Sequence, residues 1–156
     1  MDQDTVLLGQ GYYYEQLPVG FRFRTMARTI TETDLVTFIN LIWFTEDVFV
    51  NTHSTAGRAL QGRVVPGALL YSFAEGLVAP SVQFTGLAFL GMELDIKAPT
   101  VVGDTIHVEA EIIESRPASQ GPRGLVRSRN AVVNQHGETV LIYTPLRLVQ
   151  SIDMAA

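Results

Sequence analysis

The sequence predicts one α+β domain in which a curved antiparallel sheet wraps around a long, apolar helix. Three observations support this. Apolar residues recur with helical spacing over 66–78, several apolar stretches separated by turns follow, and no linker divides the 156 residues. Strands joined by turns pair antiparallel, and a sheet curled around one helix buries the apolar faces of both. With 47% hydrophobic and 17% charged residues, the chain has the composition of a folded domain.

The first third of the chain predicts a strand followed by helices. Residues 21–30 alternate apolar and charged side chains, as a half-buried strand does. Thr31 and Asp34 then have the spacing of a capping box, so a helix begins there. Residues 44–51 fit neither period and predict a loop, and 53–60 predict a short helix.

The central helix, at about 66–78, is the strongest element of the pattern. Pro66 suits the first turn, and the apolar stripe is broad enough for a helix that is buried on most sides. Apolar stretches at 84–96, 106–112, 125–133 and 139–149 predict the strands of the second half. Residues 134–137, with the sequence Asn-Gln-His-Gly, predict the hairpin turn between the last two.

Composition excludes several classes of function. A net charge of -5 argues against a nucleic-acid-binding protein, and the absence of cysteine excludes disulfides, thiolate nucleophiles and cysteine metal sites. The three histidines have no metal-ligand spacing, so no metal is expected. No stretch approaches the roughly 18 apolar residues of a membrane span. The acidic start, Met1–Asp4, is unlike a secretory signal, so we expect a cytoplasmic protein.

Several stretches together resemble the MaoC-like acyl dehydratases, the (R)-specific enoyl-CoA hydratase family. They occur in the family's order over about residues 12–150: Tyr12–Gly20, Arg28–Asp34, Gly62–Gly67 with Ser72, Pro99, Gly103–Thr105, Arg123–Val126 and Asn134–Glu138. The resemblance implies a single hotdog domain over 1–156 that pairs edge to edge as a homodimer. It also implies a hydro-lyase of fatty acid metabolism, with an acyl-CoA thioester as substrate and no cofactor beyond the coenzyme A of that substrate.

The acid/base pair of this family has no counterpart at the matching positions. The family carries an aspartate and, five residues later, a histidine, about seventeen positions before a histidine-glycine pair that opens the central helix. Counting back from Gly67 places Phe44 at the aspartate, Phe49 at the histidine and Pro66 at the helix-start histidine. Phenylalanine can neither transfer a proton nor orient a water molecule.

Residues near these positions are candidate substitutes. Glu46, Asp47 and His53 form a relocated acid/base set in one interpretation, and a solvated loop in the other. The backbone amide of Gly67 is expected to hold the thioester oxygen, as the resemblance implies. Ser72 either contacts substrate or packs its hydroxyl on the helix backbone.

Further side chains are candidates for holding the two ends of an acyl-CoA. Trp43, Phe44 and Phe49 either line an acyl pocket or belong to the core or a dimer contact. Five basic residues can meet the phosphates of coenzyme A or lie in solvent: Arg63, Lys97, Arg123, Arg127 and Arg129.

Two functions follow from these residues. The first is an enoyl-CoA hydratase or acyl dehydratase that uses Glu46, Asp47 or His53 in place of the family's pair. The alternative is an inactive thioester-binding module, or a partner subunit that lacks the pair. Loss of the pair favours binding, whereas the preserved helix start favours a retained thioester site.

Overall fold

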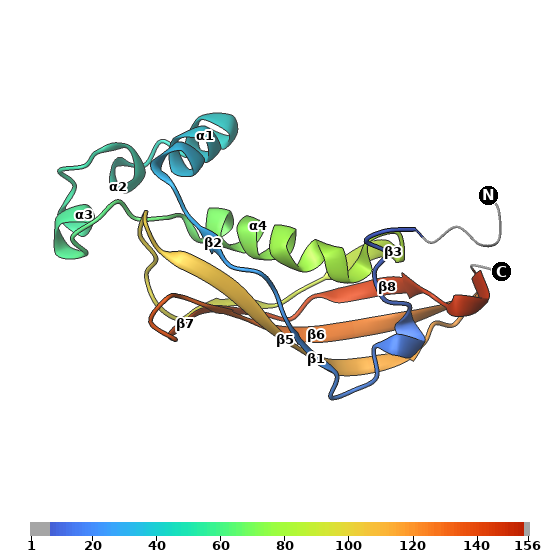
Figure 1. Ribbon diagram of the computed structural model, residues 1–156. Helices are drawn as coiled ribbons and strands as arrows, with labels where there is room; N and C mark the ends of the chain where they lie inside the picture. The colour runs from blue at the N-terminus through green and yellow to red at the C-terminus, as the bar shows by residue number, and fades with distance from the viewer. Residues whose placement is uncertain (1–6, 155–156) are drawn as a thin grey trace.

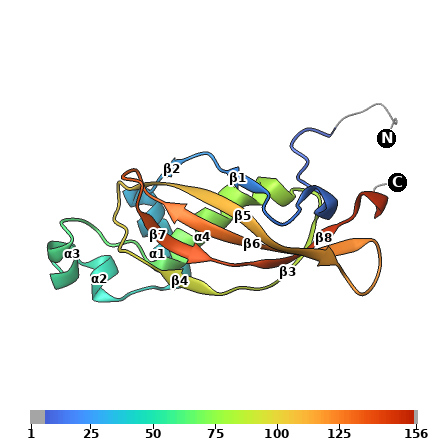
Figure 2. The same cartoon turned by 90° about the horizontal axis from the view of Figure 1, so that it is seen from below.

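A computed structural model describes residues 7–154, except for the side chain of Ala56. A curved antiparallel sheet lies along one side of a single long helix, α4 (Gly67–Val78), as Figures 1 and 2 show from two directions. This is the predicted architecture, and the helix agrees with the expected 66–78 to within one residue, because Pro66 is its N-cap.

The sheet has five positions across, and three of them are shared by two short strands. Its order is β1 and β2, then β5, β6, then β7 and β8, then β4 and β3, with every pair antiparallel. The strands are β1 (Arg22–Arg24), β2 (Arg28–Thr29), β3 (Gly86–Gly91), β4 (Leu94–Ile96), β5 (Thr105–Pro117), β6 (Arg123–Val133), β7 (Thr139–Tyr143) and β8 (Leu146–Gln150).

The first strand is interrupted where the alternation over 21–30 predicted one strand. The backbone amide of Val108 donates to the Thr25 hydroxyl at 2.9 Å, while the Thr25 amide donates to the Val108 carbonyl at 3.0 Å. A side chain thus takes a place in the ladder, and β1 and β2 form on either side of it.

Helix α1 (Glu32–Ile42) begins as predicted. The Thr31 hydroxyl accepts from the Asp34 amide at 3.2 Å, and the Asp34 carboxylate accepts from the Thr31 amide at 2.9 Å, which is a reciprocal capping box. Helix α3 (Thr55–Ala59) confirms the short helix expected over 53–60. The loop expected over 44–51 is wrong in part, because Asp47–Val50 forms one helical turn, α2.

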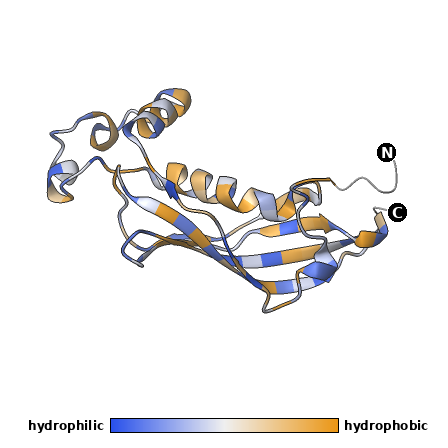
Figure 3. Ribbon diagram, viewed as in Figure 1, coloured by the Kyte–Doolittle hydropathy of each residue, from blue (hydrophilic) through white to orange (hydrophobic). Residues whose placement is uncertain are grey.

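Helix α4 is predominantly hydrophobic and packs against the inner face of the sheet (Figure 3). Its buried residues, Leu69, Leu70, Ala74 and Val78, join one core cluster with α1 and with β5, β6 and β7. Helices α1, α2 and α3 gather at the N-terminal end of α4 (Figure 1). Residues 7–154 also contain three short 3-10 helices: η1 (Tyr14–Gln16), η2 (Ala79–Val82) and η3 (Ile152–Met154).

The last strand is also divided. One strand was expected over 139–149, but β7 ends at Tyr143 and β8 begins at Leu146. Pro145 lies between them, and proline has no N–H to donate to a ladder. As a result β6 pairs with β7 along one half of its length and with β8 along the other.

The β3–β4 edge of the sheet carries an exposed apolar surface. Every residue of both strands is exposed in the isolated chain, including Phe89 at 46%, Leu90 at 53% and Ile96 at 47%. An open edge of this kind is a template for pairing with another strand. It is where we expect the predicted dimer to form.

Within residues 7–154, no helix is both long and apolar enough to cross a membrane. Met1–Asp4, on which the expectation of a cytoplasmic location rests, lie outside the described residues.

Candidate functional site

The N-terminus of α4 presents unpaired backbone amides. The first intrahelical bond runs from the Leu70 amide to the Pro66 carbonyl at 3.1 Å, and among the described residues no side chain caps the helix. The amides of residues 67–69 precede that bond and therefore have no partner within the helix. The partial positive charge at a helix N-terminus adds to their ability to hold an oxyanion.

Glycine at position 67 allows β4 to lie close to this helix end. A Cβ on Gly67 would lie 3.0 Å from Ile96 Cδ1, tighter than ordinary van der Waals contact. The fold therefore brings β4 close to the helix N-terminus, so a ligand held there would lie beside the β3–β4 edge.

Phe44 and Phe49 are partly buried and pack together. Their ring centroids lie 5.2 Å apart at 43°, and both rings pack against the core cluster that includes Leu69 of α4. Arg63 holds this segment in place, since its guanidinium donates to the Phe49 carbonyl and pairs with Glu32 of α1. The two positions expected to correspond to the family's acid/base pair thus hold apolar rings that are tilted against each other.

The three predicted proton-transfer residues lie around α2 and are exposed in the isolated chain. Glu46 is the N-cap residue of α2, and Asp47 begins the helix. The Asp47 carboxylate accepts from Asn51 Nδ2 at 2.9 Å, and His53 Nδ1 lies 3.2 Å from the Thr52 hydroxyl. The structure therefore gathers these residues in one short segment without turning them into the core.

Trp43 and Ser72 occupy different surroundings. Trp43 ends α1 in a left-handed conformation, with φ of 60°, and the residue is 85% exposed in the isolated chain. The Ser72 hydroxyl donates to the Ala68 carbonyl at 2.7 Å, as expected if it packs on the helix backbone. Ser72 nevertheless lies on the exposed side of α4.

Residues 7–154 contain no group of three or more histidine, aspartate or glutamate side chains placed to hold a metal ion. Three of the basic candidates for phosphate contact are already paired with carboxylates: Arg63 with Glu32, Lys97 with Asp95 and Arg127 with Glu114.

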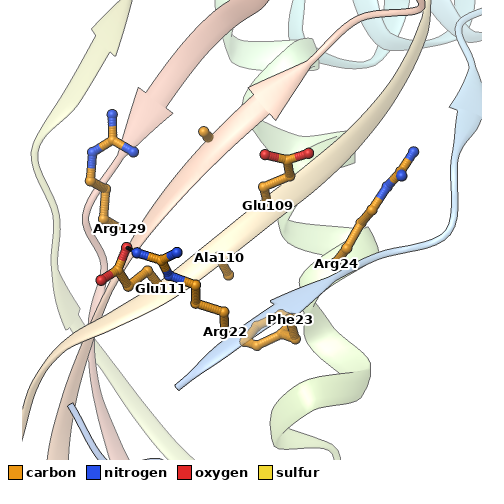
Figure 4. Close-up of a pocket in the computed structure, with 8 residues that line it drawn as sticks. Arg22, Phe23, Arg24, Glu109, Ala110, Glu111 and Arg129 are labelled. Carbon is orange, nitrogen blue, oxygen red and sulfur yellow. Dashed lines mark ion pairs between the residues drawn. The ribbon is translucent and has the colours of Figure 1, made fainter. Parts of the chain in front are cut away.

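A hollow of about 460 Å³ lies over β1, β5 and β6 (Figure 4). Its rim carries three arginines and two glutamates. Arg22 and Glu111 form an ion pair at 3.0 Å, and Glu109 lies 3.2 Å from His107 Nε2. Alternating charges of this kind suit a solvated sheet face better than a site for a phosphate group.

Comparison with known families identifies the chain. Residues 18–143 match the family described as the FAS1-like dehydratase domain region. The chain belongs to this family. Among curated proteins, it is 26% identical over 106 residues to an (R)-specific enoyl-CoA hydratase of Rhodospirillum rubrum, with 68% of this chain and 71% of the relative covered. The resemblance predicted from the sequence is thereby confirmed.

Solved structures establish the fold as a hotdog fold. The monoamine oxidase regulatory protein of Archaeoglobus fulgius is 27% identical, with a TM-score of 0.78 over 91% of this chain and 96% of that one. A MaoC domain dehydratase of Chloroflexus aurantiacus is 24% identical and superposes with a TM-score of 0.89 over 97% of this chain and 44% of that one. A double hotdog protein of Mycobacterium tuberculosis, 17% identical, has a TM-score of 0.75 over 94% of this chain and 46% of its own length.

Sequence reasoning missed a polar cluster between α4 and the sheet. Glu75 of α4 pairs with Arg147 of β8 through Arg147 Nη2, at 2.6 and 2.7 Å. Asn130 of β6 and Tyr143 of β7 are fully buried beside them. Burial, followed by the charge of Glu75, raises the pKa of Tyr143 far above that of free tyrosine, so its hydroxyl stays protonated. The available signal was that Asn130 alternates with Val126 and Val132 on the buried face of β6, and that Arg147 stands between leucines in β8.

Proposed function

We propose that this protein binds an acyl-CoA thioester at the N-terminus of α4 and interconverts 2-enoyl and 3-hydroxyacyl thioesters. The observation that carries the proposal is the set of unpaired amides at residues 67–69, in a chain of the dehydratase family. An amide aimed at the thioester oxygen stabilises the negative charge that forms on that oxygen when water adds to C3 or, in the reverse direction, when C2 loses a proton.

The reaction needs one group that moves a proton at water and another that moves a proton at C2. In hydration, a base takes a proton from water, the oxygen adds to C3, and the electron pair moves onto the thioester oxygen. An acid then delivers a proton to C2 and the carbonyl re-forms. Glu46, Asp47 and His53 are the candidate groups, and carboxylate and imidazole are suited to these two tasks.

A second function is favoured by the aromatic pair. Phe44 and Phe49 contact each other and the core, so nothing at those positions can move a proton. If the residues around α2 do not take over, the chain is a thioester-binding subunit that depends on a partner for the chemistry. In either case we propose a homodimer formed through the exposed β3–β4 edge, which covers apolar side chains beside the α4 N-terminus.

The experiment measures hydration of crotonyl-CoA by the purified protein and by three variants, Glu46→Gln, Asp47→Asn and His53→Ala. His136→Ala is the matched control, because His136 lies exposed in the β6–β7 turn. We expect turnover in the wild type and a loss of roughly 100-fold or more in at least one of the three variants. Absence of turnover together with binding of butyryl-CoA would favour the thioester-binding subunit, and absence of both would refute the proposal.

A further inference from the structure

The Glu75–Arg147 pair lies, with the buried Asn130 and Tyr143, in a largely apolar contact between helix and sheet. The Glu75 and Arg147 side chains are 25% and 12% exposed, and Arg147 lies on the inner face near the buried Val126, Val149 and Val78. A partly buried ion pair is no more stabilising than well-packed apolar residues of similar volume. Its presence here therefore suggests a role beyond stability.

The cluster has hydrogen-bonding capacity to spare. Within residues 7–154, Arg147 hydrogen-bonds through Nη2 to Glu75, which leaves its Nη1 and Nε donors unused. Tyr143 Oη and both side-chain polar atoms of Asn130 are buried without a hydrogen-bond partner of ordinary geometry in the described chain. Glu75 and Asn130 are the polar neighbours of the Tyr143 hydroxyl, so the hydrogen-bonding capacity left for a ligand is that of the Arg147 guanidinium.

A groove that is open to the surface reaches the Glu75–Arg147 pair. It has a volume of about 370 Å³, and Glu75 and Arg147 line it together with apolar residues of β3 and η2. The Arg147 guanidinium carbon lies 5.5 Å from the centroid of the Phe89 ring, so the positive charge sits between Glu75 and this aromatic side chain. In the isolated chain the groove is thus polar at one point and apolar along β3, the edge through which we propose that the homodimer forms.

The exposed side of α4 connects this groove with the thioester site. Ala68, Ser72, Glu75 and Ala79 follow helical spacing along one stripe, and Glu75 and Ala79 line the groove. The eight steps along the helix from Gly67 to Glu75 span about 12 Å along its axis. An acyl chain that starts at the Gly67 amide and follows this stripe must be of medium length to reach Glu75.

The charges of Glu75 and Arg147 decide which chemical group of an acyl chain can bind beside them. Glu75 and Arg147 neutralise each other, so a carboxylate beside them would leave an uncompensated negative charge in a poorly hydrated place. An uncharged oxygen, as in a hydroxyl or keto group, accepts from the free guanidinium donors at no such cost.

We propose that Glu75 and Arg147 form a polar subsite that selects medium-length acyl chains carrying an uncharged oxygen near their far end. This inference rests on the proposed function, because it assumes that the thioester lies at the α4 N-terminus. It adds the class of acyl chain that the site prefers.

Calorimetry with saturated thioesters tests the subsite without requiring turnover. The probes are octanoyl-CoA, its ω-hydroxy derivative and the analogue with an ω-carboxylate. The double variant Glu75→Leu/Arg147→Leu removes both charges together, so it leaves no unpaired charge and should fold. Arg22→Leu/Glu111→Leu is the matched control, since it removes an ion pair from the opposite face of the sheet.

We expect the wild type and the control to bind the ω-hydroxy thioester about tenfold more tightly than octanoyl-CoA, as one hydrogen bond to a charged group provides. The Glu75/Arg147 double variant should lose this preference and bind octanoyl-CoA at least as well as the wild type. Equal affinity of the wild type for both probes, or tightest binding of the ω-carboxylate, would overturn the subsite and leave the thioester site standing. Failure of all three to bind would overturn both.

Discussion

Replacing Asp34 with alanine should destabilise the protein by an amount that depends on pH. The Asp34 carboxylate accepts from the Thr31 amide at 2.9 Å, from the Thr31 hydroxyl at 2.7 Å and from Arg28 Nη2 at 3.0 Å. Burial opposes ionisation of Asp34, but these hydrogen bonds and the Arg28 charge outweigh it and lower the pKa of the carboxyl.

The magnitude follows from these contacts. Asp34→Ala removes the half of the capping box that the Asp34 carboxylate provides, at a cost of about 1 kcal/mol, and the Arg28 pair adds little because Arg28 is 49% exposed. The free energy of unfolding at pH 7 should therefore fall by about 1–2 kcal/mol, which lowers Tm by roughly 2–8 °C for a chain of this size. Because the folded-state pKa lies below the unfolded one, this contribution is present above the unfolded value of 3.8 and is lost as pH falls through the folded one.

Urea unfolding at several pH values between neutral and about pH 2.5 measures this effect, with Thr33→Ala on the same helix as the control. Wild type and Asp34→Ala should differ at pH 7 and converge in acid. Equal stability at pH 7, or a difference that persists unchanged at the acid end, would refute the role of the ionised carboxylate.

Three further substitutions test the packing of η1, the anchoring of the segment around α2, and the β3 edge. Gly124→Ala should destabilise the protein by about 1–3 kcal/mol in urea unfolding, because its Cβ would overlap the Tyr14 ring; unchanged stability would show that η1 can move aside. Arg63→Met should speed limited proteolysis of residues 47–60, since it removes the contact to the Phe49 carbonyl; an unchanged cleavage rate would contradict this anchor. Leu90→Asp on the β3 edge should shift the protein toward monomer in sedimentation velocity, and an unaltered association state would place the dimer contact elsewhere.

Local rules predicted the parts of the fold that depend on neighbouring residues. Thr31 and Asp34 marked the start of α1 because capping requires just these side chains three positions apart. The apolar stripe over 66–78 predicted α4 because the helical spacing of apolar side chains also depends only on residues close together in the sequence. The break at Thr25 was not predictable, because it depends on a hydrogen bond to Val108, far along the chain.

The candidate site shows a similar division. The start of α4 at residues 66 and 67 was expected from the sequence, whereas the closeness of β4, which would crowd a side chain at position 67, comes from the structure. The polar cluster was not predicted, because Glu75, Asn130, Tyr143 and Arg147 come from four elements that only the sheet topology brings together. The roles of Glu46, Asp47 and His53 stay predictions.

Amide chemical shifts of the protein titrated with butyryl-CoA test the central claim, that the α4 N-terminus holds the thioester, most directly. We expect the largest saturable changes at residues 67–69, with smaller changes along Ser72 and the α2 segment. Saturable binding that leaves the amides of 67–69 unshifted, or the absence of any binding, would contradict the account.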